Sequence, residues 1–115
     1  MTVRIYHNPR CSKSRQALQL LRDRDVEVEI VDYLKTPPDE ATLRRLLQLL
    51  ALGPRDLMRK KEKEYHELGL DDPTLDADAL IKALAEHPRL MERPIVVKDG
   101  AAVIGRPPED VLKLV

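Results

Sequence analysis

The chain has 115 residues, of which 43% are apolar, and its 20 basic residues balance its 20 acidic residues. The balanced charge argues against nucleic-acid binding through bulk charge, and three Tyr with neither Phe nor Trp give no aromatic platform for single strands. No apolar stretch is long enough to span a bilayer, and the first residues lack a long apolar core, so we expect no secretory signal and a cytoplasmic protein. A single cysteine cannot form an internal disulfide, and one Cys with three scattered His makes a poor zinc site.

The first third of the chain predicts a βαβ unit. Residues 2–6 alternate and stop at the turn-forming HNPR, which indicates a strand followed by a loop. From Ser12 to about Arg24 the apolar residues follow a helical stripe, and VEVEIVDY then alternates as a second strand. We expect these two strands to form a right-handed parallel pair.

The middle of the chain predicts helices. The segment TPPDEATLRRLLQLLALG indicates a helix capped by Thr36 or Asp39 and terminated by Gly53. Shorter helical pieces follow in PRDLM, in EKEYHELGL and from Asp76 to Glu86. Consecutive helices at this place form an insertion.

The last third predicts a hairpin and a helix. RPIVVKDGAAVIGRPP gives two short strands around a Lys-Asp-Gly turn, and Pro107 and Pro108 open the final helix. The order βαβ, helices, ββα predicts an α/β fold with a mixed sheet and helices on both faces, in a single domain over residues 1–115.

Cys11 is the candidate nucleophile. It lies between the first strand and the first helix, where helix N–H groups favour a thiolate over a thiol. Arg10, Lys13 and Arg15 surround it, and cations in a first helical turn oppose the helix dipole unless an anion sits there. The alternative is a small buried apolar residue, but the neighbours of Cys11 are polar and make a poor apolar shell.

The segment CSKS has no resolving cysteine, because Ser14 stands three residues after Cys11. A group bonded to Cys11 must therefore be removed by an external thiol. His7 is either an imidazolium near the thiolate or a solvated loop histidine. Ser14 either donates its hydroxyl to the thiolate or is a tolerated early-helix serine. With Arg15, these two residues are the candidates for stabilising the thiolate.

YHNPRCSKSR, together with ERPIVV and GRPPEDVL, resembles the glutaredoxin-coupled arsenate reductases of the ArsC family, in the ArsC/Spx branch of the thioredoxin-like superfamily. The resemblance covers essentially the whole chain, including YLKTPP and EYHELGL. It implies a thioredoxin-like fold with a four-stranded mixed sheet and a helical insertion. It also implies that Arg59, Arg93 and Arg106 hold the arsenic oxyanion attacked by Cys11, and that Pro94 is preceded by a cis peptide bond.

The implied reaction converts arsenate to arsenite. A covalent Cys11-arsenic intermediate is resolved by glutathione as co-substrate and by glutaredoxin as partner, with no bound cofactor and no metal. One departure from the family pattern is the pair Lys60 and Lys61 directly after Arg59. Alternatives are a glutathione-dependent thiol reductase of another substrate, and an RNA polymerase-binding regulator similar to the Spx proteins. The serine at position 14 excludes the Cys-x-x-Cys disulfide switch typical of such regulators.

Overall fold

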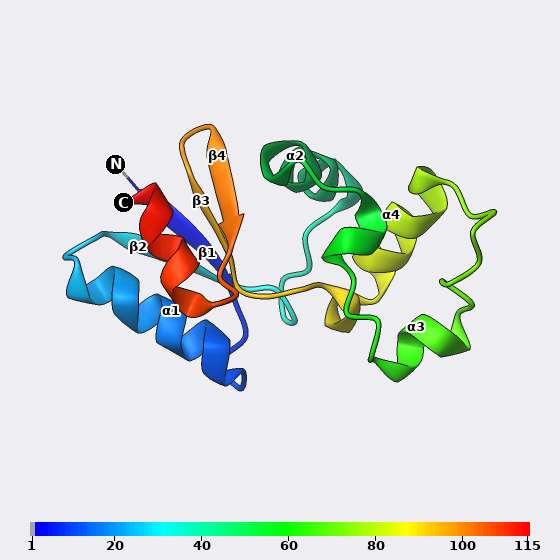
Figure 1. Cartoon of the computed structure of the whole chain (residues 1–115), viewed down its shortest axis with the longest axis horizontal. Helices are drawn as coiled ribbons and strands as arrows, with labels where there is room; N and C mark the ends of the chain where they lie inside the picture. The colour runs from blue at the N-terminus through cyan, green and yellow to red at the C-terminus, as the bar shows by residue number, and fades with distance from the viewer. Residues whose placement is uncertain (1) are drawn as a thin grey trace. The chain divides into compact units, whose positions relative to one another are not determined.

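The computed structural model describes residues 2–115, and these form two compact units (Figure 1). The first unit runs to Thr36 and resumes at Arg93. The second unit is Pro37–Glu92 and corresponds to the predicted helical insertion. Among the described residues, no helix is both long enough and apolar enough to cross a membrane.

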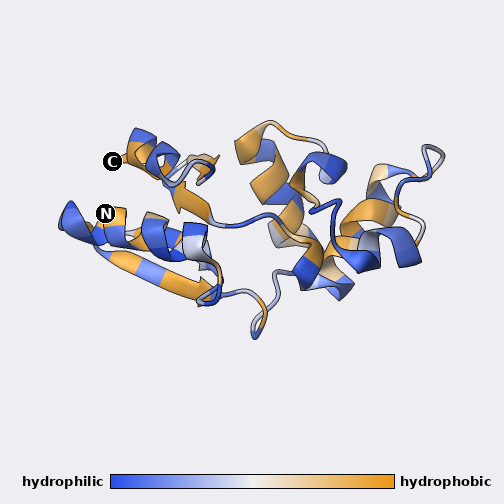
Figure 2. Ribbon diagram, turned by 60° about the horizontal axis from the view of Figure 1, so that its bottom comes forward, coloured by the Kyte–Doolittle hydropathy of each residue, from blue (hydrophilic) through white to orange (hydrophobic). Residues whose placement is uncertain are grey.

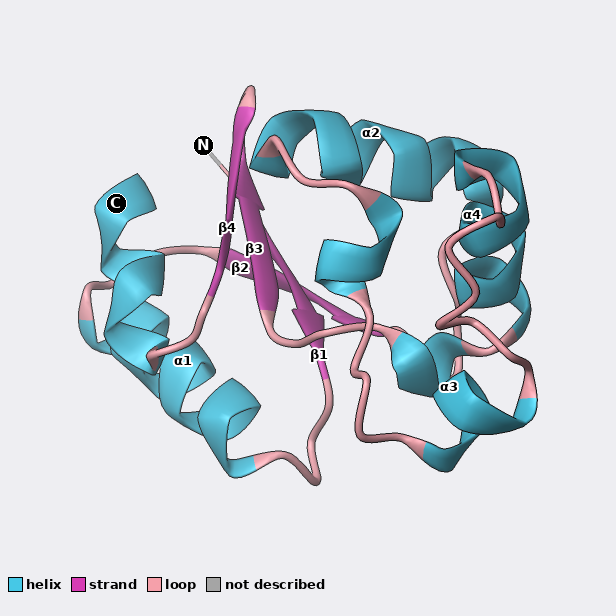
Figure 3. Ribbon diagram, turned by 45° about the vertical axis from the view of Figure 1, so that its right-hand side comes forward, coloured by secondary structure: helices cyan, strands magenta, loops and turns pink. Residues whose placement is uncertain are grey.

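The first unit is built on a four-stranded mixed sheet (Figure 3), as the family resemblance implied, and the strands lie in the order β2-β1-β3-β4. Its strands are β1 Val3–His7, β2 Val28–Asp32, β3 Ile95–Lys98 and β4 Ala101–Ile104. β1 pairs with β2 in parallel and with β3 antiparallel, so that Ile5 lies between Ile30 and Val96. β1 is thus hydrogen-bonded along both of its edges, and four of its five residues are buried.

Two helices cover one face of this sheet (Figures 1 and 3): α1, Ser12–Asp23, and the 3₁₀ helix η3, Pro108–Leu114. Side chains two apart on β1 point to the same face, so Val3 and Ile5 both meet the helical stripe of α1. The buried cluster between sheet and helices comprises Val3, Ile5, Ala17, Leu18, Leu21, Val96 and Val111. This aliphatic core fixes where β1 ends and α1 begins, and so it fixes the loop that carries Cys11.

The second unit consists of helices. They are α2 Glu40–Leu50, η1 Pro54–Leu57, α3 Lys63–Glu67, α4 Ala77–Glu86 and η2 Pro88–Leu90. Hydrophobic and hydrophilic stretches alternate along them (Figure 2), and the apolar sides of α2 and α4 pack together. Asp39 and Asp76 cap these two helices by accepting backbone N–H groups at 2.8 Å.

The predicted end of the first insertion helix is wrong. α2 ends at Leu50, and Ala51 adopts the left-handed conformation with φ 56°, although Gly53 was the expected terminator. The backbone N–H groups of Ala51 and Leu52 donate to the carbonyls of Gln48 and Leu47, which would otherwise lack partners at the helix end. Satisfying these carbonyls offsets the strain of a left-handed alanine. Gly53 instead precedes Pro54 and begins η1.

Candidate active site

Cys11 occupies the N-cap position of α1 and is partly exposed. Its own N–H donates to the Asn8 carbonyl at 3.0 Å, and its carbonyl accepts the Arg15 N–H at 3.0 Å, the first hydrogen bond of the helix. The Asn8 side chain accepts the Arg10 N–H at 3.0 Å, which closes the turn. The loop thus holds the cysteine by its backbone and leaves the sulfur at the start of the helix.

The groups around the Cys11 sulfur favour its charged form. Burial, the largest single influence, raises the pKa of the thiol, but hydrogen bonds from the Ser14 N–H, the Arg93 side chain and the Lys13 N–H outweigh it. The charge of Arg93 acts in the same direction. The net pKa of Cys11 is therefore below its ordinary value, and the thiolate is more populated at neutral pH than in a free cysteine.

Arg93 and Arg106 come together at this sulfur from opposite ends of the hairpin. Arg106 Nη2 lies 3.8 Å from Cys11 Sγ, and Arg106 Nε donates to the Arg93 carbonyl at 2.9 Å. Each of these arginines precedes a cis proline: the Arg93–Pro94 bond is cis, the conformation expected from the resemblance, and so is Arg106–Pro107. Two guanidinium groups beside one thiolate can bind a tetrahedral oxyanion and place it for nucleophilic attack.

The chain is closely packed at Gly105, which lies between the end of β4 and Arg106. Its N–H donates to the Pro94 carbonyl at 2.9 Å. A Cβ at this position would lie 2.8 Å from Pro94 Cγ and 2.9 Å from Val111 Cγ1, closer than side-chain carbons approach one another. Glycine is therefore required here, because the chain at residue 105 passes close to Pro94 and Val111. This close packing fixes the backbone positions of the neighbouring Arg93 and Arg106.

His7 and Ser14 lie together in the buried layer beneath the loop. The Ser14 Oγ is 2.6 Å from His7 Nδ1 and accepts the Asn8 N–H at 3.1 Å. Burial, more than any nearby charge, lowers the pKa of His7, so we assign the neutral imidazole, with Nδ1 accepting the Ser14 O–H. The Ser14 hydroxyl is thus used within this network, and it is the Ser14 backbone N–H that faces the Cys11 sulfur.

The remaining two sequence candidates are Arg15 and Arg59. Arg15 Nη1 donates to the Pro9 carbonyl at 2.9 Å, which braces the loop. Arg59 belongs to the second unit, where its Nη1 is 2.6 Å from Glu62 Oε1 and its Nε is 3.8 Å from Glu92 Oε1. The structure therefore brings Cys11, Arg93 and Arg106 together in the first unit. Arg59 belongs to the second unit, where two carboxylates hold its guanidinium group.

Sequence reasoning missed the role of Asn8. Its side chain, its N–H and its carbonyl all hydrogen-bond within the cysteine loop, and the residue is only 8% exposed. The available signal was the dipeptide Asn-Pro, because asparagine side chains readily bond the backbone two residues ahead. Within residues 2–115, no group of three or more His, Cys, Asp or Glu side chains is arranged to hold a metal ion.

Residues 6–114 match the model of the ArsC family. The chain is 59% identical over 114 residues to the uncharacterized protein YfgD of Escherichia coli K12, a match that covers 98% of this chain and 96% of that protein. It is 53% identical over 110 residues to an arsenate reductase of Neisseria meningitidis, with 95% and 94% covered. The solved structure of an arsenate reductase from Vibrio cholerae has a TM-score of 0.97 at 52% identity, covering 100% of this chain and 98% of that chain.

Proposed function

The chain belongs to the ArsC family, and from that premise we propose that it is an arsenate reductase whose nucleophile is Cys11. The family and the thioredoxin-like fold predicted from the sequence are confirmed by the matches above. One observation carries the proposal: a thiol of lowered pKa lies at a helix start beside the guanidinium groups of Arg93 and Arg106. These are the groups needed to hold a doubly charged tetrahedral oxyanion against a thiolate.

The first step forms one bond and breaks one. The Cys11 thiolate attacks arsenic(V), an S–As bond forms, and one As–O bond breaks as the oxygen leaves as hydroxide or water. Arg93 and Arg106 stabilise the negative charge that spreads over the remaining oxygens. No electrons are transferred to arsenic in this step.

The second and third steps need thiols from outside the chain, because Cys11 is its only cysteine. The glutathione thiolate forms a second S–As bond while a second As–O bond breaks and its oxygen leaves as hydroxide or water, so that arsenic(V) carries both sulfurs. A glutaredoxin thiolate then attacks the glutathione sulfur, an S–S bond forms, and the S–As electron pair stays on arsenic, which becomes arsenic(III). Water releases arsenite and regenerates Cys11. Since glutathione must be available in reduced form, we propose that the protein works in the cytoplasm.

Arg59 is proposed as the third oxyanion ligand, on the residue correspondence with the family. Its pairing with Glu62 and Glu92 means that its charge is partly compensated before substrate binds. If Arg59 does bind arsenate, Arg59→Ala should raise the KM for arsenate, and Arg59→Lys should restore little of the affinity, because an ammonium group lacks the planar fork. An unchanged KM in Arg59→Ala would remove this residue from the site.

The test is a coupled assay that follows NADPH oxidation by glutathione reductase in the presence of glutathione, glutaredoxin and arsenate. We expect arsenate-dependent turnover by the wild-type chain and none by Cys11→Ser. Ser12→Ala is the matched control, because Ser12 is the exposed neighbour of Cys11. Folded wild-type protein with no arsenate-dependent turnover, assayed with active partners, would contradict the proposal.

A second candidate function is a glutathione-dependent thiol reductase of another substrate. The observation that favours it is the pairing of Arg59 with two carboxylates, which partly compensates the charge of one of the three guanidinium groups proposed to hold arsenate. The same assay with a glutathionylated protein in place of arsenate distinguishes the two. Turnover with the mixed disulfide and none with arsenate would favour this second function.

A further inference from the structure

A hollow of about 340 Å³ adjoins the cysteine loop in the first unit. It is lined by Asn8, Pro9, Arg10, Asp32, Leu34 and Lys35. Its walls follow the carboxyl ends of the two parallel strands, since Asn8 comes directly after β1 and Asp32 is the last residue of β2. In α/β sheets this end of the parallel strands is where ligands bind.

Two of the residues that line the hollow adjoin Cys11, one in sequence and one through a hydrogen bond. Arg10 precedes the cysteine, and the Asn8 carbonyl accepts the Cys11 N–H at 3.0 Å. A ligand seated here is therefore next to the loop that carries the sulfur. The volume lies at the lower end of the range found for small-molecule sites, of roughly 300 to 1,000 Å³.

The charges that line the hollow do not cancel. Arg10 and Lys35 contribute two cations and Asp32 one anion, so the lining carries a net charge of +1 at neutral pH. Within residues 2–115, neither the Arg10 guanidinium nor the Lys35 ammonium makes a hydrogen bond or an ion pair, whereas Asp32 Oδ1 accepts the Leu34 N–H at 3.2 Å. Two uncompensated cations around one hollow are suited to two carboxylates of a ligand.

The apolar part of the hollow comes from Leu34 and Pro9. Leu34 is 38% exposed and is one of only three large apolar side chains exposed among the described residues. An apolar side chain left open between charged ones can pack against the uncharged middle of an elongated polar ligand. The lining thus offers two cations, one anion and an apolar wall.

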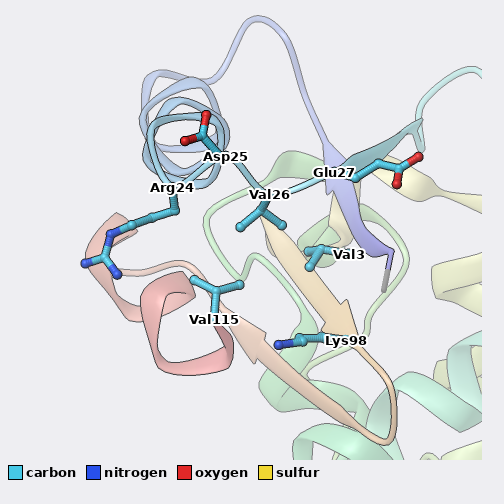
Figure 4. A pocket seen from close by; sticks show the side chains of 7 residues that line it. All are labelled: Val3, Arg24, Asp25, Val26, Glu27, Lys98 and Val115. Atoms are coloured by element: carbon cyan, nitrogen blue, oxygen red, sulfur yellow. The ribbon is translucent and has the colours of Figure 1, made fainter.

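A second, larger hollow in the same unit has no such relation to the cysteine (Figure 4). It has a volume of about 490 Å³ and is lined by Val3, Arg24, Asp25, Val26, Glu27, Lys98 and Val115. It contains the first residue of β1, four residues before the end of that strand, or about 13 Å away along the sheet. Its lining includes two basic and two acidic side chains, which together carry no net charge.

We propose that the hollow beside the cysteine loop binds the thiol co-substrate, a small molecule with one ammonium group, two carboxylates and a thiol. Its net charge of −1 complements the lining: Arg10 and Lys35 receive the carboxylates, Asp32 receives the ammonium group, and Leu34 packs against the middle of the molecule. This inference rests on the proposed function, because it is the lone Cys11 that requires an external thiol. Binding itself forms and breaks no covalent bond. The bound molecule is the glutathione that then attacks arsenic in the second step of the proposed reaction.

The first experiment measures binding without turnover. The full chain carrying Cys11→Ser is labelled with nitrogen-15 and titrated with S-methylglutathione, which cannot react. We expect amide shifts at Asn8, Arg10, Leu34 and Lys35. The double substitution Arg10→Ala/Lys35→Ala should raise the dissociation constant roughly twofold to thirtyfold, the effect expected for the loss of two exposed charge pairs. The matched control, Arg24→Ala/Lys98→Ala in the other hollow, should change it less than twofold.

Ligand variants test the carboxylates from the other side. The diethyl ester of S-methylglutathione lacks both carboxylates. It should therefore bind with the same affinity to the Cys11→Ser chain and to that chain carrying Arg10→Ala/Lys35→Ala. The single reversal Lys35→Glu changes an exposed side chain and should weaken binding of the free acid more than Lys35→Ala does. Equal affinity in the two double variants, shifts at Arg24 and Lys98 instead, or no shift at millimolar ligand would overturn the proposal.

The second experiment separates this inference from the proposed function. In the coupled assay, Arg10→Ala/Lys35→Ala should raise the KM for glutathione and leave the KM for arsenate unchanged. Arsenate turnover with an unchanged glutathione KM would overturn the site and leave the reductase intact. Binding of S-methylglutathione at the hollow in a protein that does not turn over arsenate would support the site and contradict the reductase.

Discussion

Arg106 Nη2 lies 3.8 Å from Cys11 Sγ although the two residues are 95 positions apart in the chain. The contact is possible because β3 and β4 form a hairpin in which β3 pairs with β1. The chain therefore leaves β4 at the same end of the sheet at which β1 ends and the cysteine loop begins. The same hairpin brings Arg93 to the sulfur from its other end. The electrostatics of the thiol therefore depend on the folding of a segment distant in sequence.

Arg93 should control the ionisation of Cys11. Arg93→Ala removes both a hydrogen bond to the sulfur and a nearby positive charge, so we expect the pKa of Cys11 to rise. The measurement is the pH dependence of the alkylation rate with iodoacetamide. We also expect kcat/KM for arsenate to fall roughly tenfold to a hundredfold, as for loss of one charged hydrogen bond. Arg45→Ala, an exposed arginine of α2, should change neither; an unshifted pKa in Arg93→Ala would contradict the role of Arg93.

Ser14 should stabilise the loop more than the thiolate. Ser14→Ala leaves the buried His7 Nδ1 and Asn8 N–H without their partner, so the free energy of unfolding should fall by about 1–3 kcal/mol. The pKa of Cys11 should change less than in Arg93→Ala, because the N–H of residue 14 remains. Denaturant unfolding and alkylation rates provide the two readouts.

The matched control for this prediction is Ser12→Ala. Ser12 has the same side chain two residues earlier in the same helix, but it is exposed. We expect its stability to stay within about 0.5 kcal/mol of the wild type. If Ser14→Ala instead raised the pKa of Cys11 as much as Arg93→Ala does, the Ser14 hydroxyl would have to act on the thiolate itself.

The buried His7 should make the protein less stable in mild acid. Its pKa is lower in the folded chain than in the unfolded chain, so between the two values the unfolded state binds more protons and the free energy of unfolding rises with pH. Its contribution is therefore complete above about pH 6.5, the usual histidine value, and is lost as the pH falls toward the lowered value. His7→Gln should flatten this part of the stability profile.

Denaturant unfolding measured at a series of pH values tests this expectation. His66→Gln, at an exposed histidine of α3, controls for loss of an imidazole elsewhere. Identical slopes in the wild type and His7→Gln would mean that His7 is not the group whose protonation destabilises the fold.

Gly105 should tolerate no side chain. In Gly105→Ala the new methyl group would meet Pro94 and Val111 at 2.8 and 2.9 Å, so one of these segments must move. We expect a loss of about 1–3 kcal/mol in the free energy of unfolding, typical of overpacking, and a rise in the pKa of Cys11 as Arg93 shifts. Gly100→Ala is the control, because a Cβ there meets nothing within 4 Å. Equal stability of the two variants would show that the packing at Gly105 is loose.

The order of elements and the choice of Cys11 as the candidate nucleophile follow from the sequence alone. Strand alternation and helical stripes are local, so β1, α1 and the hairpin were predicted to within a few residues. The conflict between a helix start and the cations around Cys11 singled out the loop before any fold was known. The capping of α2 by Asp39 was likewise one of two local options, whereas its end at Ala51 was not readable, because a left-handed alanine is supported by hydrogen bonds rather than by residue type.

The partners of the thiol were decided by the tertiary structure. Arg93 and Arg106 are two of 20 basic residues, and without the family resemblance no local pattern distinguishes them. They reach Cys11 because hairpin pairing places both ends of one distant segment beside the end of β1. Burial likewise determines the state of His7, which matches neither interpretation from the sequence: it is a neutral, buried hydrogen-bond partner of Ser14. Charge and burial are properties of the whole packed unit, so a linear sequence does not specify them residue by residue.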